Sequence, residues 1–484
     1  MLIKHYFSLI FLPFLSFSFL MGQSPNSTAV NQMLTTKGLE HASIGFCVKD
    51  LSGNIIAQHN MNQSYVPAST LKLITTATAF EVLGADFQYE TLLARGKMKP
   101  NRLIVYGSGD PTLGSEHLYD KPDSFLSEWV KAVADAFGQQ KEIEVLAVDN
   151  YFGYRGVSRK WIHEDIGNYF AAGAYGLSVF DNTYRLVFNT ENRNSAPKII
   201  ETKPLMKDLV FNNTLTLNTT SKDNGYILGE PFSNQRNIIG DIPANRKRFT
   251  IKGDIPNPGL FLVGTISSEL EQAGFKVGKK ETTYNKFHDE MYLTNRAEVD
   301  GTVFYVHKSP NLSKIARIIN LKSNNHYTEH LIRTLGRQRN KDIYSLPLEE
   351  GVEKIRDVWE SKGLNTNALI MYDGCGLAPS NAVSAAFMCD VLKYMQTESA
   401  NGVQFFNSLP LAGREGTVRN FLKGTRLEGK VHVKSGSIAN VQCFAGYYVE
   451  GEKKYTFSIM VNNYYGSRQS VVKAIERLLL ASLR

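Results

Sequence analysis

The sequence predicts an α/β (α+β) protein in which one split domain is interrupted by a large β-rich insertion. Three observations carry this prediction: helical periodicity near both ends, closely spaced strand-like runs between them, and turn clusters that separate these runs. The chain of 484 residues is long enough for two or three domains with a large apolar core. We expect a signal peptide at residues 1–22, a split domain at 23–87 and 294–484, and an inserted β-rich region at 88–293.

The N-terminus has the pattern of a secretory signal. Lys4 and His5 precede an apolar stretch from Tyr6 to Leu20, and small or polar residues follow it. The stretch is short for a membrane span, so we expect cleavage near Gly22, with an uncleaved anchor as the alternative. The protein should therefore be exported to the periplasm or cell envelope.

The overall charge suits anionic surroundings, because the formal net charge is +8. The Lys and Arg residues are scattered, without a basic run interleaved with aromatic residues, so we expect no nucleic-acid partner. An anionic polymer such as cell wall fits the charge equally well. After the N-terminus no run of 18 or more apolar residues occurs, so the mature protein should be soluble or peripheral to a membrane.

Cysteine usage argues against a disulfide scaffold. The chain has four widely spaced cysteines, at positions 47, 375, 389 and 443. There is no Cys-x-x-Cys pair that would suggest zinc or a redox centre. One disulfide is compatible with the sequence, which does not indicate the pair.

The N-terminal part of the split domain is predicted as a hairpin followed by a helix. Residues Ser43–Asp50 form the first expected strand, and Asn54–Gln58 form its partner. Apolar residues then recur at helical spacing over Ser69–Leu83. Pro67 favours an extended approach, so Ser69 should lie at or near the helix N-terminus.

The later elements divide into a strand-rich middle and a mixed C-terminal part. Strand-like runs of the middle are Leu103–Val105, Glu144–Val148, Leu215–Leu217, Tyr226–Leu228 and Arg248–Lys252. Helices are predicted at Leu312–Leu335, Leu348–Lys362 and Val383–Met395. Strands are then predicted at Lys430–Lys434, Phe444–Val449 and Tyr455–Val461. A closing amphipathic helix at Val471–Leu483 leaves peripheral membrane contact open.

The first chemical candidate is the pair Ser69 and Lys72. Residues three apart share a helix face, so the lysine amine can approach the serine hydroxyl. The helix N-terminus adds N–H groups and a positive dipole where an oxyanion would develop. A partly buried lysine with a lowered pKa can accept the serine proton. The same Ser-x-x-Lys spacing recurs at Ser195–Lys198 and Ser470–Lys473, so it is weak evidence alone.

Two further candidates follow in the C-terminal part. Ser323 could relay protons, and Asn325 could hydrogen-bond a substrate carbonyl, although Ser-x-Asn is common in turns. The run Lys434-Ser435-Gly436-Ser437 ends a predicted strand and offers a cation and hydroxyls to a substrate carboxylate. Gly436 would let the strand backbone approach a substrate closely. Together, the three motifs match the Ser-x-x-Lys, Ser-x-Asn, Lys-[Ser/Thr]-Gly set of penicillin-binding proteins and serine β-lactamases.

Further stretches make the resemblance specific. The sequence resembles the D-alanyl-D-alanine carboxypeptidase/endopeptidase family, the class C low-molecular-mass penicillin-binding proteins (peptidase family S13), from about Ser43 to its end. The stretches that carry the resemblance are Tyr106–Leu113, Val148–Phe152, Asp373–Leu377, Leu411–Asn420 and Phe444–Tyr447. It implies a transpeptidase-type domain, an antiparallel sheet flanked by helices, with large extra domains inserted between the first two motifs.

The resemblance also implies a role for each motif residue. Ser69 resembles the acylated nucleophile, Lys72 its general base, and Ser323 the relay to the leaving group. Asn325 resembles a substrate contact, and Lys434 and Ser435 resemble partners of the relay and of the substrate carboxylate. The N–H groups of Ser69 and Ser437 would form the oxyanion hole. Two departures occur: Ser435 replaces the commoner Thr, and Cys375 replaces the usual Ser in the Asp-Gly-x-Gly-Leu turn, where we expect a structural role.

The expected activity is hydrolysis of D-Ala-D-Ala-type bonds in peptidoglycan stem peptides through an acyl-enzyme on Ser69. Carboxypeptidase and endopeptidase action both remain open because one site would serve both. β-Lactams should acylate the same serine. No metal or organic cofactor is implied.

Other functions compete with this one. His326 and His330 match His-x-x-Glu-His, so a zinc metallopeptidase is the alternative; otherwise the two histidines should lie on a helix surface. A non-catalytic peptidoglycan-binding protein on the same fold is a further alternative. A β-lactamase is the nearest enzymatic rival, but the large insertion favours a peptidase.

Overall fold

The computed structural model describes residues 25–192, 195–286, 300–342 and 345–484. The predicted signal peptide, residues 1–22, lies outside these ranges. Within them, no helix combines the length and the apolar character needed to cross a membrane.

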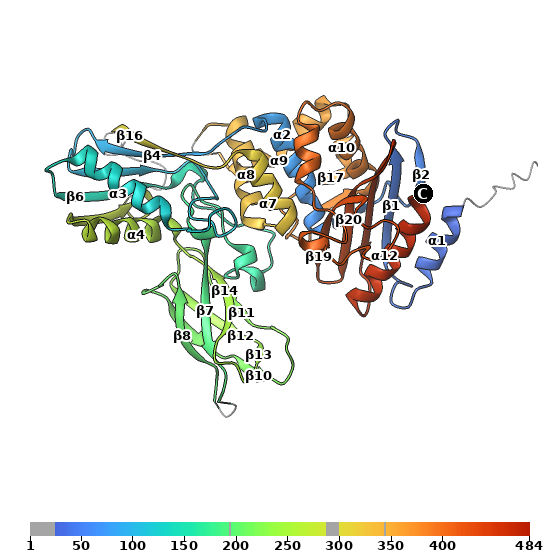
Figure 1. The fold of residues 1–484 in the computed structure, drawn as a ribbon, viewed down its shortest axis with the longest axis horizontal. Coiled ribbons are helices and arrows are strands. Elements are labelled where there is room, and N and C mark those ends of the chain that lie inside the picture. The colour runs from blue at the N-terminus through green and yellow to red at the C-terminus, as the bar shows by residue number, and fades with distance from the viewer. Residues whose placement is uncertain (1–24, 193–194, 287–299, 343–344) are drawn as a thin grey trace, which may run out of the picture.

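A five-stranded antiparallel sheet with the order β19-β20-β21-β1-β2 occupies one end of the molecule (Figure 1). Its strands are β1 (Ser43–Asp50), β2 (Ile55–His59), β19 (Val431–Ile438), β20 (Val441–Glu450) and β21 (Lys453–Asn462). Strand β1 pairs with β21 along its whole length, so the two ends of the chain share one sheet. Together with its flanking helices, this sheet confirms the predicted fold class.

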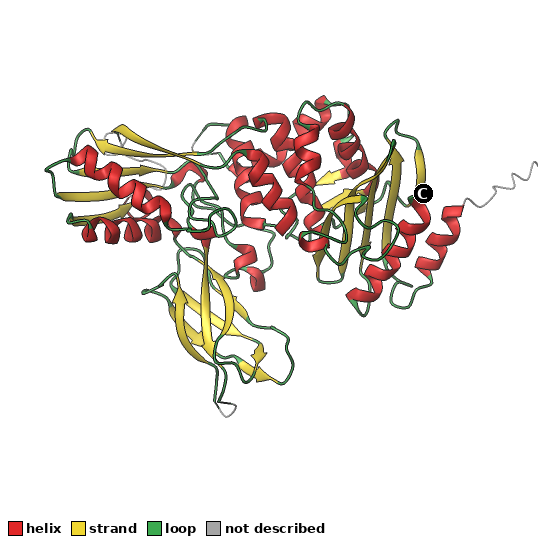
Figure 2. Cartoon of the chain, in the orientation of Figure 1, coloured by secondary structure: helices red, strands yellow, loops and turns green. Residues whose placement is uncertain are grey.

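Helices cover both faces of this sheet, as Figures 1 and 2 show. One face packs against α1 (Pro25–Leu34) and α12 (Arg468–Ser482). The other faces a helical layer made of α2 (Lys72–Leu83), α7 (Leu312–Lys322), α8 (Asn325–Arg339), α9 (Pro347–Ser361), α10 (Ala385–Thr397) and α11 (Gly402–Ser408). Successive residues of a strand point to opposite faces, so β20 supplies Val441 and Cys443 to the helical layer and Phe444 to the α12 layer.

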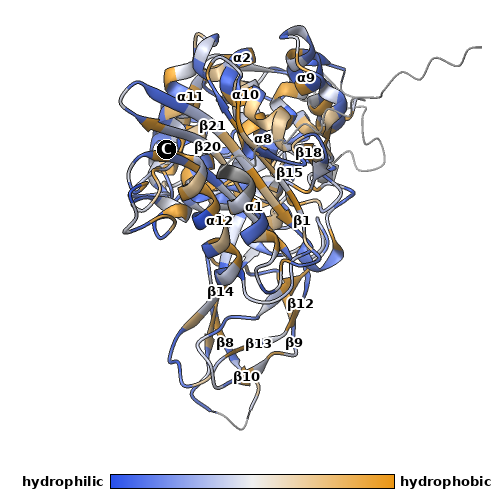
Figure 3. Cartoon of the chain, turned by 90° about the vertical axis from the view of Figure 1, so that its right-hand side faces the viewer, coloured by the Kyte–Doolittle hydropathy of each residue, from blue (hydrophilic) through white to orange (hydrophobic). Residues whose placement is uncertain are grey.

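Helix α12 is amphipathic, and hydrophobic and hydrophilic residues mix along it in Figure 3. Its buried residues follow the i, i+3, i+4, i+7, i+8 spacing of one helix face: Val471, Ala474, Ile475, Leu478 and Leu479. This face belongs to the apolar core on the sheet. The apolar stripe of α12 is therefore buried inside the protein.

A second five-stranded sheet, with the order β15-β6-β5-β4-β16, lies at the opposite end of the molecule (Figure 1). Its strands are β4 (Glu90–Gly96), β5 (Arg102–Tyr106), β6 (Glu142–Val148), β15 (Lys276–Thr282) and β16 (Gly301–Lys308). Helices α3 (Ser124–Phe137) and α4 (Pro258–Gln272) pack with it. Strands β4 and β16 pair antiparallel, so that Glu90 lies opposite Lys308.

A third group of strands projects away from the rest of the molecule (Figure 2). It contains β7 (Thr183–Asn189), β8 (Lys198–Lys203), β9 (Val210–Asn213), β10 (Thr216–Asn218), β11 (Tyr226–Leu228), β12 (Gln235–Ile239), β13 (Asp241–Pro243) and β14 (Phe249–Asp254). These strands enclose a small apolar core of their own. Shorter elements complete the fold: β3 (Ser64–Tyr65), β17 (Leu369–Ile370), β18 (Ala382–Ser384) and α5 (Thr283–Lys286).

The helix predicted over Leu312–Leu335 is wrong in one respect, because the structure breaks it into α7 and α8. Ser323 lies between them with φ 58°, in the left-handed region, and its N–H donates to the carbonyl of Ile319. Asn324 then caps α8, because its side chain accepts a hydrogen bond from the Tyr327 N–H. The break places Ser323 and Asn325 at a turn between two helices.

Candidate active site

Ser69 lies in a 3₁₀ turn, Ala68–Leu71, that leads directly into α2. Ala68 has φ 46°, a left-handed conformation that costs a non-glycine residue free energy and is common at functional sites. A Cβ on Gly436 would lie 2.9 Å from the Ser69 nitrogen, and one on Gly376 would lie 1.9 Å from the Ala68 carbonyl oxygen. Glycine at both positions therefore allows β19 and the Gly376 turn to approach the Ser69 backbone.

Lys72 is completely buried and lies among three oxygen atoms. Its Nζ is 2.8 Å from Ser69 Oγ, 2.6 Å from Asn325 Oδ1 and 2.6 Å from the Cys375 carbonyl oxygen. Burial lowers the pKa of this amine, although the nearby acidic groups partly oppose the shift. A neutral amine in this position can donate to Asn325 and Cys375 while it accepts the proton of Ser69.

Asn325 begins α8 and links Lys72 to a distant part of the chain. Its Oδ1 accepts from Lys72, and its Nδ2 donates to the Phe170 carbonyl oxygen at 2.7 Å. Phe170 belongs to the 3₁₀ turn Tyr169–Ala171, between β6 and β7. The strand-rich middle of the chain thus reaches the candidate site through one main-chain carbonyl.

Lys434 forms the second half of the site. It is completely buried on β19, and its Nζ donates to Ser323 Oγ at 2.8 Å and to the Ser435 carbonyl oxygen at 2.6 Å. Burial lowers its pKa well below the ordinary value, and the charge of Lys72 lowers it further. The hydroxyl of Ser435 lies 2.8 Å from Thr417 Oγ1, and Ser437, two residues further along β19, is half-buried.

The structure therefore brings the eight predicted site residues together from three chain segments. These residues are Ser69, Lys72, Ser323, Asn325, Lys434, Ser435, Gly436 and Ser437. The sequence analysis assigned no role to Phe170 or Thr417 and only a structural role to Cys375, although each contacts one of these residues. Cys375 and Thr417 lie in stretches that carried the family resemblance, whereas Phe170 had no signal in the sequence.

Two buried carboxylates hold the turn that carries the Cys375 carbonyl. Asp373 accepts hydrogen bonds from the N–H groups of Gly376 at 2.7 Å and Ala378 at 2.6 Å. Glu329, on α8, accepts from the N–H groups of Gly374 at 2.8 Å and Cys375 at 3.0 Å. These contacts fix the direction of the carbonyl towards Lys72, while burial raises the pKa of the Cys375 thiol well above its ordinary value.

The expected surface position of His326 and His330 is wrong, because both side chains are buried. His330 Nδ1 lies 2.7 Å from the Gly109 carbonyl oxygen, and its Nε2 lies 3.2 Å from Ser178 Oγ. Burial lowers the pKa of His326 to about 3. In the described part of the chain, neither histidine belongs to a group of three residues with converging metal-ligand atoms. The geometry gives the zinc alternative no support.

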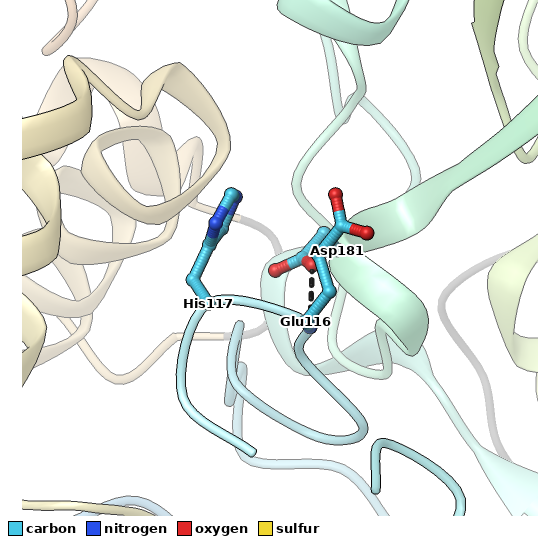
Figure 4. Close-up of side chains that lie close together, drawn as sticks. All are labelled: Glu116, His117 and Asp181. Atoms are coloured by element: carbon cyan, nitrogen blue, oxygen red, sulfur yellow. Dashed lines mark hydrogen bonds between the residues drawn. The ribbon is translucent and has the colours of Figure 1, made fainter. Parts of the chain in front are cut away.

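Two other groups do place three such atoms together among the described residues. One is Glu329, Asp373 and Cys375, whose carboxylates hold the turn described above. The other is Glu116, His117 and Asp181, shown in Figure 4. There the Glu116 carboxylate pairs with Arg185 and Lys252, and Asp181 accepts from the Glu116 N–H at 3.0 Å. Both groups are thus accounted for by contacts within the protein.

Comparisons with known proteins agree with this geometry. The profile of the D-Ala-D-Ala carboxypeptidase 3 (S13) family matches residues 26–481. A D-alanyl-D-alanine carboxypeptidase of an Actinomadura strain is 26% identical over 457 residues, which cover 90% of this chain and 81% of the relative. The D-alanyl-D-alanine carboxypeptidase DacB of Haemophilus influenzae is 25% identical over 443 residues, which cover 89% and 88%.

A solved structure shares the fold. The crystal structure of penicillin binding protein 4 (dacB) from Haemophilus influenzae superposes with a TM-score of 0.76 and 22% identity. The superposition covers 94% of this chain and 99% of the other. The arrangement of both five-stranded sheets and the projecting strands therefore belongs to a known architecture.

Proposed function

The chain belongs to the D-Ala-D-Ala carboxypeptidase 3 (S13) family of serine peptidases, and from this premise we propose that Ser69 is its nucleophile. The observation that carries the proposal is the position of Lys72 Nζ, 2.8 Å from Ser69 Oγ in a fully buried setting. A lysine with a lowered pKa is neutral more often at a given pH, and only the neutral amine can accept the serine proton.

Acylation would begin when Ser69 Oγ attacks the carbonyl carbon between two D-residues and Lys72 takes its proton. The oxyanion would be held by the N–H groups of Ser69 and Ser437. The close approach of Gly436 to the Ser69 nitrogen supports this pairing of donors. Asn325 would hydrogen-bond a carbonyl of the substrate while its Oδ1 accepts a hydrogen bond from Lys72.

The leaving amine needs a proton when the peptide bond breaks. We assign its delivery to Ser323, whose Oγ accepts a hydrogen bond from Lys434 and lies at the turn between α7 and α8. Lys434, Ser435 and Ser437 would bind the terminal carboxylate of the substrate. Ser323 would then recover a proton from Lys72, which had taken it from Ser69. In deacylation, water would attack the ester and pass a proton to the neutral Lys72. Lys72 would return this proton to Ser69 Oγ as the ester bond breaks, which restores the starting state.

The substrates would be peptidoglycan stem peptides, cleaved at their free end or at a cross-link, since one site would serve both reactions and both attack a carbonyl between two D-residues. β-Lactams would acylate Ser69 and leave slowly. Export to the periplasm or cell envelope, supported by the sequence of residues 1–22, would bring the enzyme to this substrate. Peripheral membrane contact remains a prediction, and the apolar face of α12 does not support it.

The domain division also stays a proposal, in a modified form. We assign the catalytic domain to residues 23–87 and to the C-terminal part of the chain. Because β16 pairs with β4, we extend the inserted region from residue 293 to about Lys308. The insertion holds helices α3 and α4 as well as strands, and its Phe170 carbonyl supports Asn325.

A fluorescent penicillin tests the nucleophile directly. The purified protein, Ser69→Ala and Ser470→Ala would be labelled side by side and separated on denaturing gels. Ser470 is a matched control, because it begins another Ser-x-x-Lys pattern, on α12. We expect label on the wild type and Ser470→Ala and none on Ser69→Ala. Label on Ser69→Ala, or none on folded wild type, would refute the assignment.

A further inference from the structure

Gln442 lies behind the candidate site, buried in β20. Its neighbours Val441 and Cys443 point into the helical layer that carries Ser69, so Gln442 points to the opposite face, towards α12. Its Nε2 donates to the Gly436 carbonyl oxygen at 3.1 Å, and its Oε1 accepts from Arg468 Nε at 2.7 Å. Gln442 lies opposite Ser437 in the β19–β20 ladder, and among the described residues no hydrogen bond joins Gln442 or Arg468 to a side chain of the proposed site.

The two partners fix the orientation of the Gln442 amide. A guanidinium has only donors, so the amide oxygen must face Arg468. A main-chain carbonyl has only acceptor sites, so the amide NH₂ group must face Gly436. Exchange of the amide oxygen and nitrogen would place donor against donor at Arg468 and acceptor against acceptor at Gly436. The Gln442 amide therefore has a single allowed orientation.

That orientation acts on a single peptide unit. The Gly436 carbonyl and the Ser437 N–H belong to the same peptide, and the only cis peptide in the described residues is elsewhere, at Lys203-Pro204. In a trans peptide, the carbonyl and the N–H point in opposite directions. Pairing of β19 with β20 sets the direction of this peptide. A side-chain donor on the Gly436 oxygen reinforces that direction and polarises the Ser437 N–H, since linked hydrogen bonds strengthen one another.

We infer that Gln442, oriented by Arg468, is a positioning residue that aligns and polarises the Ser437 N–H as an oxyanion donor. The inference rests on the proposed function, in which this N–H stabilises the charge on the reacting carbonyl. The guanidinium, the side-chain amide and the peptide form one chain of aligned dipoles that ends at the developing oxyanion. Its effect falls on the transition state, so it should change kcat and the acylation rate and leave KM nearly unchanged.

The test compares acylation by a penicillin in full-length variants. Gln442→Leu removes both hydrogen bonds, and Gln442→Glu keeps the contact with Arg468 but presents an acceptor to the Gly436 oxygen. We expect each to lower the acylation rate about tenfold, less than the roughly 10²–10³-fold loss on removal of an oxyanion donor itself. Arg468→Ala should have a smaller effect, and Arg468→Lys should lie closer to the wild type.

A spectroscopic readout separates this role from a general loss of stability. The ester carbonyl of the acyl-enzyme, followed by infrared difference spectroscopy, should absorb at higher wavenumber in both Gln442 variants, because weaker hydrogen bonds polarise it less. Thr456→Val is the matched control: Thr456 is buried in the same sheet, and its Oγ1 has no partner in the described part of the chain. Its band and its acylation rate should equal those of the wild type.

Folded Gln442→Leu with the wild-type rate and an unshifted band would overturn the inference alone. A folded wild type that is not acylated would overturn the proposed function together with it. Arg468 is exposed, so Arg468→Ala preserves core packing and provides the test if Gln442→Leu does not fold. An unshifted band in Arg468→Ala would then overturn the inference.

Discussion

The surroundings of Lys72 and Lys434 differ, although both amines are completely buried and both have a lowered pKa. Lys72 contacts Ser69, Asn325 and the Cys375 carbonyl. Burial lowers its pKa, and the acidic groups of Cys375, Asp373 and Glu329 oppose this lowering. Among the described residues, the amine of Lys434 hydrogen-bonds to a hydroxyl and to a carbonyl oxygen, and the charge of Lys72 adds to the lowering of its pKa by burial.

Because their surroundings differ, the two amines are suited to different functions. Nearby acidic groups keep the pKa of Lys72 from falling as far as burial alone would bring it, so the amine retains affinity for the proton of Ser69. In the part of the chain that the structure describes, no acidic group is among the contacts of Lys434, and a substrate carboxylate would supply one when it binds. The first lysine is therefore prepared for proton transfer and the second for recognition of an anion.

The largest effect should come from Lys72→Ala. Without the base, we expect the acylation rate to fall by about 10³–10⁴, the upper part of the range for general-base catalysis. Stopped-flow measurement with a fluorescent penicillin gives this rate. Lys473→Ala, which changes the lysine of the Ser-x-x-Lys pattern on α12, is the control and should remain active. A tenfold or smaller loss in Lys72→Ala would assign the base elsewhere.

Lys434→Ala should have the next largest effect, about 10²-fold on acylation, because it removes electrostatic stabilisation and the contact with Ser323. The pH dependence of the acylation rate in this variant distinguishes the roles of the two lysines. Protonated Lys72 cannot accept the serine proton, so the rate falls as the pH drops below the pKa of Lys72. Lys434→Ala should lower the rate at every pH and leave the midpoint of this acidic limb in place. If the acylation rate of Lys434→Ala no longer fell at low pH, the two lysines would have each other's roles.

Glu329→Gln should move that midpoint to lower pH. The Glu329 charge raises the pKa of Lys72, so its removal lets this pKa fall further and extends activity towards acid. The variant also leaves Arg333 without its buried partner at 2.7 Å, at a cost of about 3 kcal/mol in the free energy of unfolding. Denaturant titration measures this cost, and a midpoint that moves to higher pH would contradict the prediction.

Cys375→Ser should have the smallest effect, about twofold or less on acylation, because Lys72 contacts the main-chain carbonyl, which serine retains. The buried thiol, with its raised pKa, should also resist alkylation in the folded protein. Mass spectrometry after iodoacetamide treatment, with and without denaturant, checks this. Modification of Cys375 in the native protein, or a large loss in Cys375→Ser, would give the thiol itself a role.

Much of the fold was predictable because its signals are local. Alternating or continuous apolar runs predicted β1, β20 and β21, and helical spacing predicted α9, α10 and α12. The break at Ser323 was missed, because apolar periodicity continues across α7 and α8 and a left-handed serine leaves no mark in it. The burial of His326 and His330 was missed because residues distant in sequence, among them Gly109 and Ser178, cover that face of α8.

The candidate site shows the same limit. Side chains with distinct chemistry, such as Ser69 and Lys72, can be identified in the sequence by their residue type and spacing. The contacts of Phe170 and Cys375 use main-chain carbonyls, which every residue possesses, so no sequence pattern distinguishes them. Their directions depend on turns held by distant groups, for example Asp373 and Glu329.

The pairing of β4 with β16 has a consequence for how the chain reaches its native state. Bringing Ser69 and Ser323 together directly would require closure of a very long loop, which costs chain entropy and slows folding. Once the second sheet has formed, Glu90 and Lys308 are neighbours, and the remaining search involves only short connections on either side. The insertion thus brings the two segments of the catalytic domain close together before either segment has folded.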